Sequence, residues 1–339
     1  MKILAQYAHD YLPAATTVLS TQQHNQVRKV TVDAEFAGQR IDNFLMRELK
    51  GVPRSAIYKI LRRGEVRVNG GRARQTYKLS AGDEVRIPPV RTTVSAGPVH
   101  VSEGLNELLA RSILYEDRDL LVINKPAGLA VHGGSGQSLG LIEALRVMRP
   151  GVLGLELVHR LDKPTSGCLL VAKRRSKLRA LHEALREGRM QKNYFALAQG
   201  RWPAKVKQVD APLRKSVLRS GERMVTVQAD GKAALSRFKR VAEVEAATLL
   251  DVNIRTGRTH QIRVHAAHVG CPLAGDERYG DTQFNAIMSK HGLRRLFLHA
   301  RRVHLDDLTV VAPLPEDLSA CLRQLGINPS AVEAALAGS

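Results

Sequence analysis

The 339 residues are 44% hydrophobic and 25% charged, a balance that argues against a disordered chain and leaves room for two folded domains. No apolar run approaches the ~20 residues of a membrane-spanning helix, and the first residues lack the apolar core of a secretory signal, so we expect a cytoplasmic protein with no membrane association. The formal net charge of +20 favours a polyanionic partner such as nucleic acid, with a solubilising surface or an anionic membrane as alternatives.

The first hundred residues predict an extension followed by a small domain. Residues 1–38 show little periodicity, and we expect them to be partly mobile. Residues 39–91 predict two short amphipathic helices, the second capped by Ser55, and then a hairpin that turns at Asn69-Gly70. An alternating stretch near residue 85 predicts the last strand of this domain.

Basic residues are concentrated in this small domain. Between residues 40 and 91 there are thirteen Lys and Arg against five Asp and Glu. Two helices followed by a basic hairpin resemble the alpha-L RNA-binding module, first known from a small-subunit ribosomal protein, and an ordinary basic αβ domain is the alternative. The resemblance implies RNA contacts from Arg54, Lys59, Arg62, Arg63, Arg67, Arg72 and Arg74.

The rest of the chain predicts an α+β catalytic domain with mixed, mainly antiparallel sheets. Residues 92–107 are rich in Thr, Ser, Gly and Pro, and we interpret them as a linker. Residues 108–325 combine many strand patterns with few helices, and residues 326–339 are expected to form a tail. One pair of these strands is expected to form a hairpin that turns at Asp230-Gly231.

The segment VHRLDKPTSG at 158–167 places a carboxylate among cations. Asp162 falls in a loop between two candidate strands, LELV and CLLVAK, where reacting groups are often held. Neighbouring cations would keep the carboxylate ionised. The alternative is that Asp162 only caps a turn with Thr165 or Ser166. A kinase catalytic loop is excluded, because the order of its motif is changed and its other motifs are absent.

A second cluster, RTGRTHQIRVHAAH at 255–268, combines three arginines with three histidines, and its second half predicts a helix. A metal site is not indicated, because the H-E-x-x-H pattern is missing and the three cysteines are widely spaced. The cluster is better interpreted as an anionic-substrate site, with an arginine able to pair with a carboxylate.

Tyr194 lies in QKNYFALAQG, an alternating stretch that predicts a strand with Tyr194 and Ala196 on one face and Phe195 on the other. An aromatic side chain at this position can belong to the core. It can equally lie flat against a nucleobase.

Five segments together resemble the RluA family of pseudouridine synthases over residues 35–325: NKPAGLAVH, HRLDKPTSGCLLVAK, QKNYFALAQG, GRTHQIRVH and LFLHARRVHL. The resemblance implies that Asp162 is the catalytic aspartate and that Arg263 pairs with it. Lys163-Pro164 stands where the nearest subgroup of this family often has an arginine and an acid, and this difference should not alter the reaction class. The further substrate-binding residues implied are Tyr194, which would stack on the base, Leu298, which would form an apolar wall, Arg160 and His159.

The resemblance also implies an activity. The enzyme would break the C1′–N1 bond of a uridine, turn the base and rejoin it through C5, without a cofactor because no redox change occurs. Attack on C1′ and removal of the C2′ proton both remain open as the role of the carboxylate. The implied substrate is 23S ribosomal RNA of the large subunit or an assembly intermediate, modified at several sites by a monomer. A non-catalytic ribosomal RNA-binding protein and an RNA N-glycosidase are the alternatives.

Overall fold

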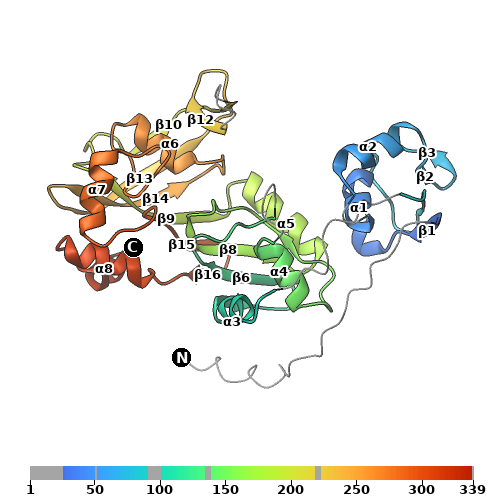
Figure 1. Ribbon diagram of the computed structural model, residues 1–339, viewed down its shortest axis with the longest axis horizontal. Coiled ribbons are helices and arrows are strands. Elements are labelled where there is room, and N and C mark those ends of the chain that lie inside the picture. Colours follow the sequence, from blue (N-terminus) through green and yellow to red (C-terminus); the bar gives the residue numbers. More distant parts are fainter. Residues whose placement is uncertain (1–25, 50–51, 91–100, 134–138, 218–222, 338–339) are drawn as a thin grey trace. The chain divides into compact units, whose positions relative to one another are not determined.

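The computed structural model describes residues 26–49, 52–90, 101–133, 139–217 and 223–337. The chain divides into two compact units, the first ending at His100 and the second beginning at Val101. Figure 1 colours the chain along its sequence and labels many of its helices and strands. Each unit has its own hydrophobic core, and we describe the two separately. In the described ranges, every helix is too short or too polar to cross a lipid bilayer.

The first unit packs two helices on a small antiparallel sheet of strand order β1-β4-β2-β3. Ile41, Phe44 and Leu45 lie on the buried face of α1, and Ile57 and Leu61 on that of α2, as their spacing predicts. The elements are β1 (Arg28–Thr31), the short helix η1 (Ala34–Phe36), α1 (Ile41–Glu48), α2 (Arg54–Arg62), β2 (Arg67–Val68), β3 (Gly71–Arg72) and β4 (Glu84–Ile87).

Two details of this unit differ from the sequence expectation. Its sheet begins with β1, before the expected boundary at residue 39, because Arg28–Thr31 pair with Glu84–Ile87. Helix α2 begins at Arg54 with Pro53 as its N-cap, so Ser55 is not the cap. The hairpin turn is confirmed, since Asn69 and Gly70 take φ values of 50° and 80°. Residues 1–25 of the expected extension lie outside the described residues.

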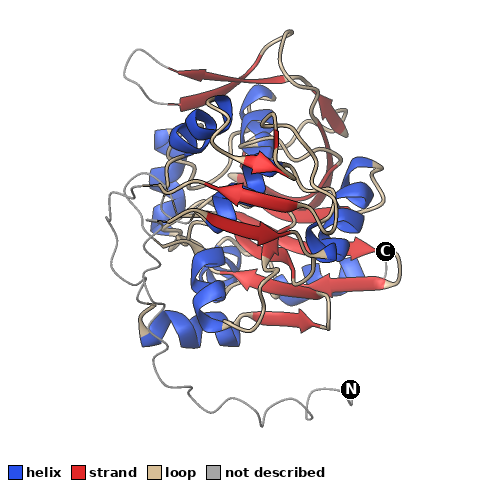
Figure 2. Ribbon diagram, turned by 90° about the vertical axis from the view of Figure 1, so that its right-hand side faces the viewer, coloured by secondary structure: helices blue, strands red, loops and turns tan. Residues whose placement is uncertain are grey.

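The second unit is built on a large mixed sheet, with helices on both of its faces (Figure 2). The first half contains α3 (Glu103–Arg111), β5 (Ile113–Glu116), β6 (Leu120–Lys125), α4 (Leu141–Met148), β7 (Glu156–Leu157), β8 (Ser166–Ala172), α5 (Arg175–Arg186), β9 (Gln191–Gln199) and β10 (Gln208–Asp210). The second half contains β11 (Leu213–Val217), β12 (Arg223–Val227), β13 (Leu235–Glu243), β14 (Ala247–Ile254), α6 (Gln261–His268), α7 (Thr282–Lys290), β15 (Leu298–Leu305), β16 (Leu308–Val311), α8 (Glu316–Gln324) and α9 (Pro329–Ala337).

The strand order β10-β13-β14-β9-β15-β8-β6-β5 is antiparallel except where β15 runs parallel to β8, which confirms the predicted α+β class. Strand β9 shows how the sheet is buried. Tyr194, Ala196 and Ala198 pack in one cluster with α4 and α6, whereas Phe195 and Leu197 pack in another with α7 and α8. The predicted alternation along this strand is therefore confirmed, with both faces covered.

Three expectations for this unit were wrong in detail. The proposed linker contains the start of α3, which is capped by Ser102, while residues 92–100 lie outside the described residues. The expected tail contains α9, whose Val332 is buried in the same cluster as α8. Strand β12 pairs with β11 in a separate two-stranded ribbon and not with β13, because β13 pairs with β10 and β14.

Candidate active site

A pocket of about 530 Å³ opens in the second unit, within the range of roughly 300–1,000 Å³ of pockets that hold small ligands. It lies between the loop at 158–165, strand β9 and the segment at 254–263. Among the described residues that line it, Asp162 is the only acid. The Lys and Arg side chains that line it are Arg160, Arg186, Lys192, Arg255, Arg258 and Arg263.

Asp162 lies in the loop between β7 and β8, as predicted. Its backbone oxygen accepts a hydrogen bond from the N–H of Thr165, which closes the turn. The carboxylate instead faces two cationic or polar groups: Oδ2 lies 3.6 Å from Nη1 of Arg263 and 3.9 Å from Nε2 of His260. Its side chain keeps 15% exposure, so it is reachable from the pocket. The turn-cap interpretation therefore does not account for this side chain.

Arg263, on α6, has a closer partner than the one implied by the resemblance. Its Nε and Nη2 donate to the two carboxylate oxygens of Asp276 at 2.8 and 2.7 Å. Burial opposes ionisation of Asp276, but the hydrogen bonds and charge of Arg263, together with hydrogen bonds from the backbone N–H groups of Tyr279 and Arg278, outweigh it, so the pKa of Asp276 is lowered. Arg263 thus lies between two carboxylates, and the pairing with Asp276 is the tighter one.

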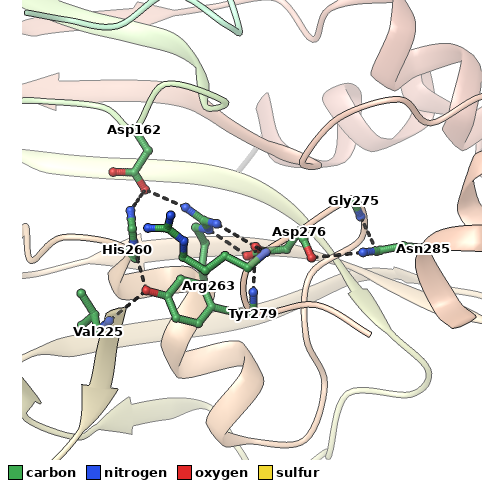
Figure 3. A network of polar contacts seen from close by, with 9 residues as sticks. Asp162, Val225, His260, Arg263, Gly275, Asp276, Tyr279 and Asn285 are labelled. Atoms are coloured by element: carbon green, nitrogen blue, oxygen red, sulfur yellow. Dashed lines mark hydrogen bonds and ion pairs between the residues drawn. The ribbon is translucent and has the colours of Figure 1, made fainter. Parts of the chain in front are cut away.

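The loop that carries Asp276 is itself held in place (Figure 3). Gly275 takes φ +69°, and a Cβ there would lie 2.1 Å from the carbonyl oxygen of Arg295, so only glycine fits. Asn285 of α7 accepts from the N–H of Gly275 and donates to the carbonyl oxygen of Asp276. The N–H groups of Arg278 and Tyr279 donate to the Asp276 carboxylate. Asp276 is therefore fixed from several sides.

Tyr194 and Leu298 both line the pocket, with 5% and 4% exposure. They come from the neighbouring strands β9 and β15, so they form part of one wall. Burial, together with the charge of Asp162, raises the pKa of Tyr194 and keeps the phenol neutral. Tyr194 is both a core residue and a pocket residue, so the two interpretations of its position are compatible.

His159 and Arg160 are neighbours in the same loop but differ in burial. His159 is half-buried, and its Nε2 accepts from the N–H of Leu170, which ties the loop to β8. Burial lowers the pKa of His159 to about 3, so the ring is neutral. Arg160 is exposed and lines the pocket. The structure therefore gives His159 an anchoring contact and leaves the side chain of Arg160 accessible.

Two buried lysines of this unit, one beneath the Asp162 loop and one in the pocket wall, were not identified from the sequence. Lys125 is fully buried, and its Nζ donates to the carbonyl oxygens of Pro126, Leu129 and Lys163, which ties β6 to the Asp162 loop. Lys192 is 7% exposed and lines the pocket, and burial lowers its pKa to about 8. Lys192 lies two residues before Tyr194 on the same strand. Side chains with this spacing point to the same face of a sheet, so the sequence could have identified Lys192 as a neighbour of Tyr194.

Comparisons with known proteins agree with this geometry. The sequence profile of the RNA pseudouridylate synthase family matches residues 119–268, and that of the S4 domain matches residues 39–85. Ribosomal large subunit pseudouridine synthase C of Yersinia pestis is 52% identical over 310 residues, 89% of this chain and 97% of that protein. The chain belongs to the RNA pseudouridylate synthase family.

Further relatives of this synthase support the assignment. The enzyme of the same name from Escherichia coli K12 is 53% identical over 309 residues, 88% of this chain and 97% of that protein. The solved structure of human RNA pseudouridylate synthase domain containing 4 aligns with a TM-score of 0.56 at 27% identity, covering 66% of this chain and 96% of that one. Members of the family are isomerases that act on RNA, and the predicted enzyme class is therefore confirmed.

The S4 domain of the synthase carries the predicted basic residues on its surface. Arg54, Lys59 and Arg62 are exposed on α2, and Arg67 on β2 is half-buried. Arg63 is exposed, and its Nη1 lies 3.6 Å from Oε1 of Glu65. Arg72 and Arg74 are exposed on and after the hairpin. Since S4 is an RNA-binding domain, the predicted alpha-L module is confirmed, whereas the individual RNA contacts stay predictions.

Proposed function

We propose that this protein isomerises specific uridines of 23S ribosomal RNA, at several separate sites, to pseudouridine, and that Asp162 is the catalytic residue. The large-subunit enzymes to which the chain is 52–53% identical support the choice of substrate. One observation supports the choice of residue: Asp162 is the only acid among the described residues that line a basic pocket, and it lies 3.6 Å from Arg263.

Each of the pocket side chains has its own proposed role in the reaction. The carboxylate of Asp162 acts at the sugar, by attack on C1′ or by removal of the C2′ proton, and Arg263 orients it. The uracil leaves as an anion, which the positive pocket stabilises. Tyr194 stacks on the flipped base and Leu298 packs behind it. Arg160 and His159 complete the substrate-binding set.

The S4 domain would bind the phosphates of structured RNA through its exposed arginines and lysines, and so bring the target uridine to the pocket. We propose that the protein works as a monomer. Its three buried free cysteines fit a reducing compartment, which supports a cytoplasmic location.

The test is incubation with large-subunit RNA transcripts labelled with tritium at C5 of uridine. A synthase releases tritium and keeps the base on the chain, and mapping then gives the modified sites. An N-glycosidase would leave abasic sites, and a binding protein would do neither. Either of these two results would overturn the proposed function.

A further inference from the structure

We propose that Tyr279 and His260 are positioning residues that fix the carboxylate of Asp162, and that β12 anchors them through the backbone N–H of Val225. The inference rests on the proposed role of Asp162. A continuous chain of contacts carries it (Figure 3). The N–H of Val225 lies 3.0 Å from Oη of Tyr279, Oη lies 2.7 Å from Nδ1 of His260, and Nε2 lies 3.9 Å from Oδ2 of Asp162.

The hydrogen bonds of Tyr279 favour one tautomer of His260. Oη of Tyr279 accepts from Val225, so its own proton is available for Nδ1 of His260. A ring that accepts at Nδ1 carries its proton at Nε2, the nitrogen that faces Asp162. Burial lowers the pKa of His260, which favours this neutral form, and the neighbouring charges are those of Asp162, Arg263, Arg278 and Asp276. The selected tautomer therefore presents an N–H to the carboxylate.

The backbone of His260 supports a functional constraint. It takes φ 54° and ψ 21° as the N-cap of α6, a left-handed conformation that is unfavourable for a residue other than glycine. This conformation places the ring between Tyr279 and Asp162, with its side chain only 14% exposed. A residue whose backbone is unfavourable and whose side chain links two polar groups is a candidate for positioning rather than for packing.

The same loop controls both contacts to Asp162. Asp276 holds Arg263, and Tyr279, three residues later, holds His260. The ring of Tyr279 also lies 5.0 Å from the guanidinium of Arg263. Val225 packs with Val264 of α6 and with Tyr279, so the β11–β12 ribbon braces the loop from outside. Removal of the Tyr279 hydroxyl alone should therefore disturb His260 while leaving Arg263 in place.

The test compares Tyr279→Phe, His260→Asn and the double variant in single-turnover assays on saturating labelled RNA. Tyr279→Phe keeps the ring beside Arg263. Asn tolerates the left-handed backbone and can reach Tyr279 but is too short to reach Asp162. We expect each single variant to lose about tenfold to a hundredfold in rate with unchanged RNA affinity, as small misplacements of reacting groups do. We expect the double variant to be no slower than the slower single variant, because both act through one chain of contacts.

His260→Gln serves as the conservative variant, since its amide can reach the position of Nε2, and it should recover most of the rate. Tyr115→Phe is the matched control, because its hydroxyl bonds Asp117 and the residue does not line the pocket. Unchanged rates in Tyr279→Phe, additive losses in the double variant, or weaker RNA binding with an unchanged rate would overturn the proposal.

A second readout does not depend on activity. Nitrogen NMR of histidine-labelled protein, with His260 assigned from the His260→Asn difference among the twelve histidines, should show the Nε2–H tautomer. It should show a mixture in Tyr279→Phe. An Nδ1–H tautomer in the wild type would overturn the positioning proposal even if the enzyme is active. Absence of tritium release by the wild type, with the expected tautomer present, would instead overturn the proposed function.

Discussion

The guanidinium of Arg263 donates two hydrogen bonds to the carboxylate of Asp276, a side chain with no solvent exposure. The arginine that faces Asp162 is therefore held in place by a second acid, and its orientation does not depend on Asp162. A preorganised cation of this kind contributes to catalysis because it needs no rearrangement during the reaction.

Replacement of Arg263 by leucine should abolish turnover and also destabilise the fold. The loss of stability is expected to be about 3–5 kcal/mol, because the variant leaves the buried carboxylate of Asp276 without its partner. Chemical denaturation of the wild type, Arg263→Leu and the exposed control Arg240→Leu measures this difference. A variant that unfolds at the wild-type denaturant concentration would show that the pair contributes nothing to stability.

Asp276→Asn should lower the free energy of unfolding in a pH-dependent way. The folded-state pKa of Asp276 is lowered, so its contribution is fully present above the unfolded pKa and is lost as the pH falls through the folded pKa. We expect a difference of about 3 kcal/mol near neutral pH that shrinks below pH ~4. Urea unfolding of both proteins across a pH series tests it, and a constant offset at all pH values would contradict it.

Lys192→Met should make the protein more stable and less active. Burial lowers the pKa of Lys192 to about 8, so keeping it charged at neutral pH costs the fold about 3 kcal/mol, a cost that disappears as the pH rises from about 8 to 10.5. The rate should fall because the pocket that stabilises the anionic base loses a positive charge. We would test this prediction by measuring melting temperatures and single-turnover rates of the wild type and Lys192→Met, with a variant at an exposed lysine, Lys239→Met, as the control. A less stable variant with full activity would be inconsistent with this prediction.

Much of the fold follows from local patterns. The alternation around Tyr194, the Asn69-Gly70 turn and the loop around Asp162 were each predictable, because they depend on side-chain spacing or on turn residues close together in the sequence. Helix α9 was not, because its Val332 is buried against residues far away in the sequence. The pairing of β12 was not, because its partner β11 was not recognised as a strand from its sequence.

The candidate site likewise contains residues that the sequence identifies and residues that it does not. The motifs identified Asp162 and Arg263, but not Asp276, which lies thirteen residues after Arg263 and has no local pattern that marks a buried acid. The left-handed backbone of His260 was also not predictable, since no local pattern marks it and its side chain makes tertiary contacts to Tyr279 and Asp162.

Removal of residues 1–100 should preserve the catalytic unit, which has its own core. Binding to ribosomal RNA should weaken and depend less on salt, by ~0.9 in the logarithmic slope for each lost duplex phosphate contact or ~0.7 on single strands. The single-turnover rate on a saturating minimal substrate should persist, since uniform binding energy appears in KM. Filter binding across a salt series tests this. An unchanged salt slope would show that the S4 domain does not grip phosphates, and a collapsed rate would place it in the active site.

The most direct test of the account is Asp162→Asn, because an amide of the same shape can neither attack the sugar nor accept its proton. Single-turnover release of tritium from C5-labelled large-subunit RNA should be undetectable in the purified variant. Its RNA affinity by filter binding and its melting temperature should match the wild type. Measurable formation of pseudouridine by the pure Asp162→Asn protein would contradict the assignment of the catalytic residue.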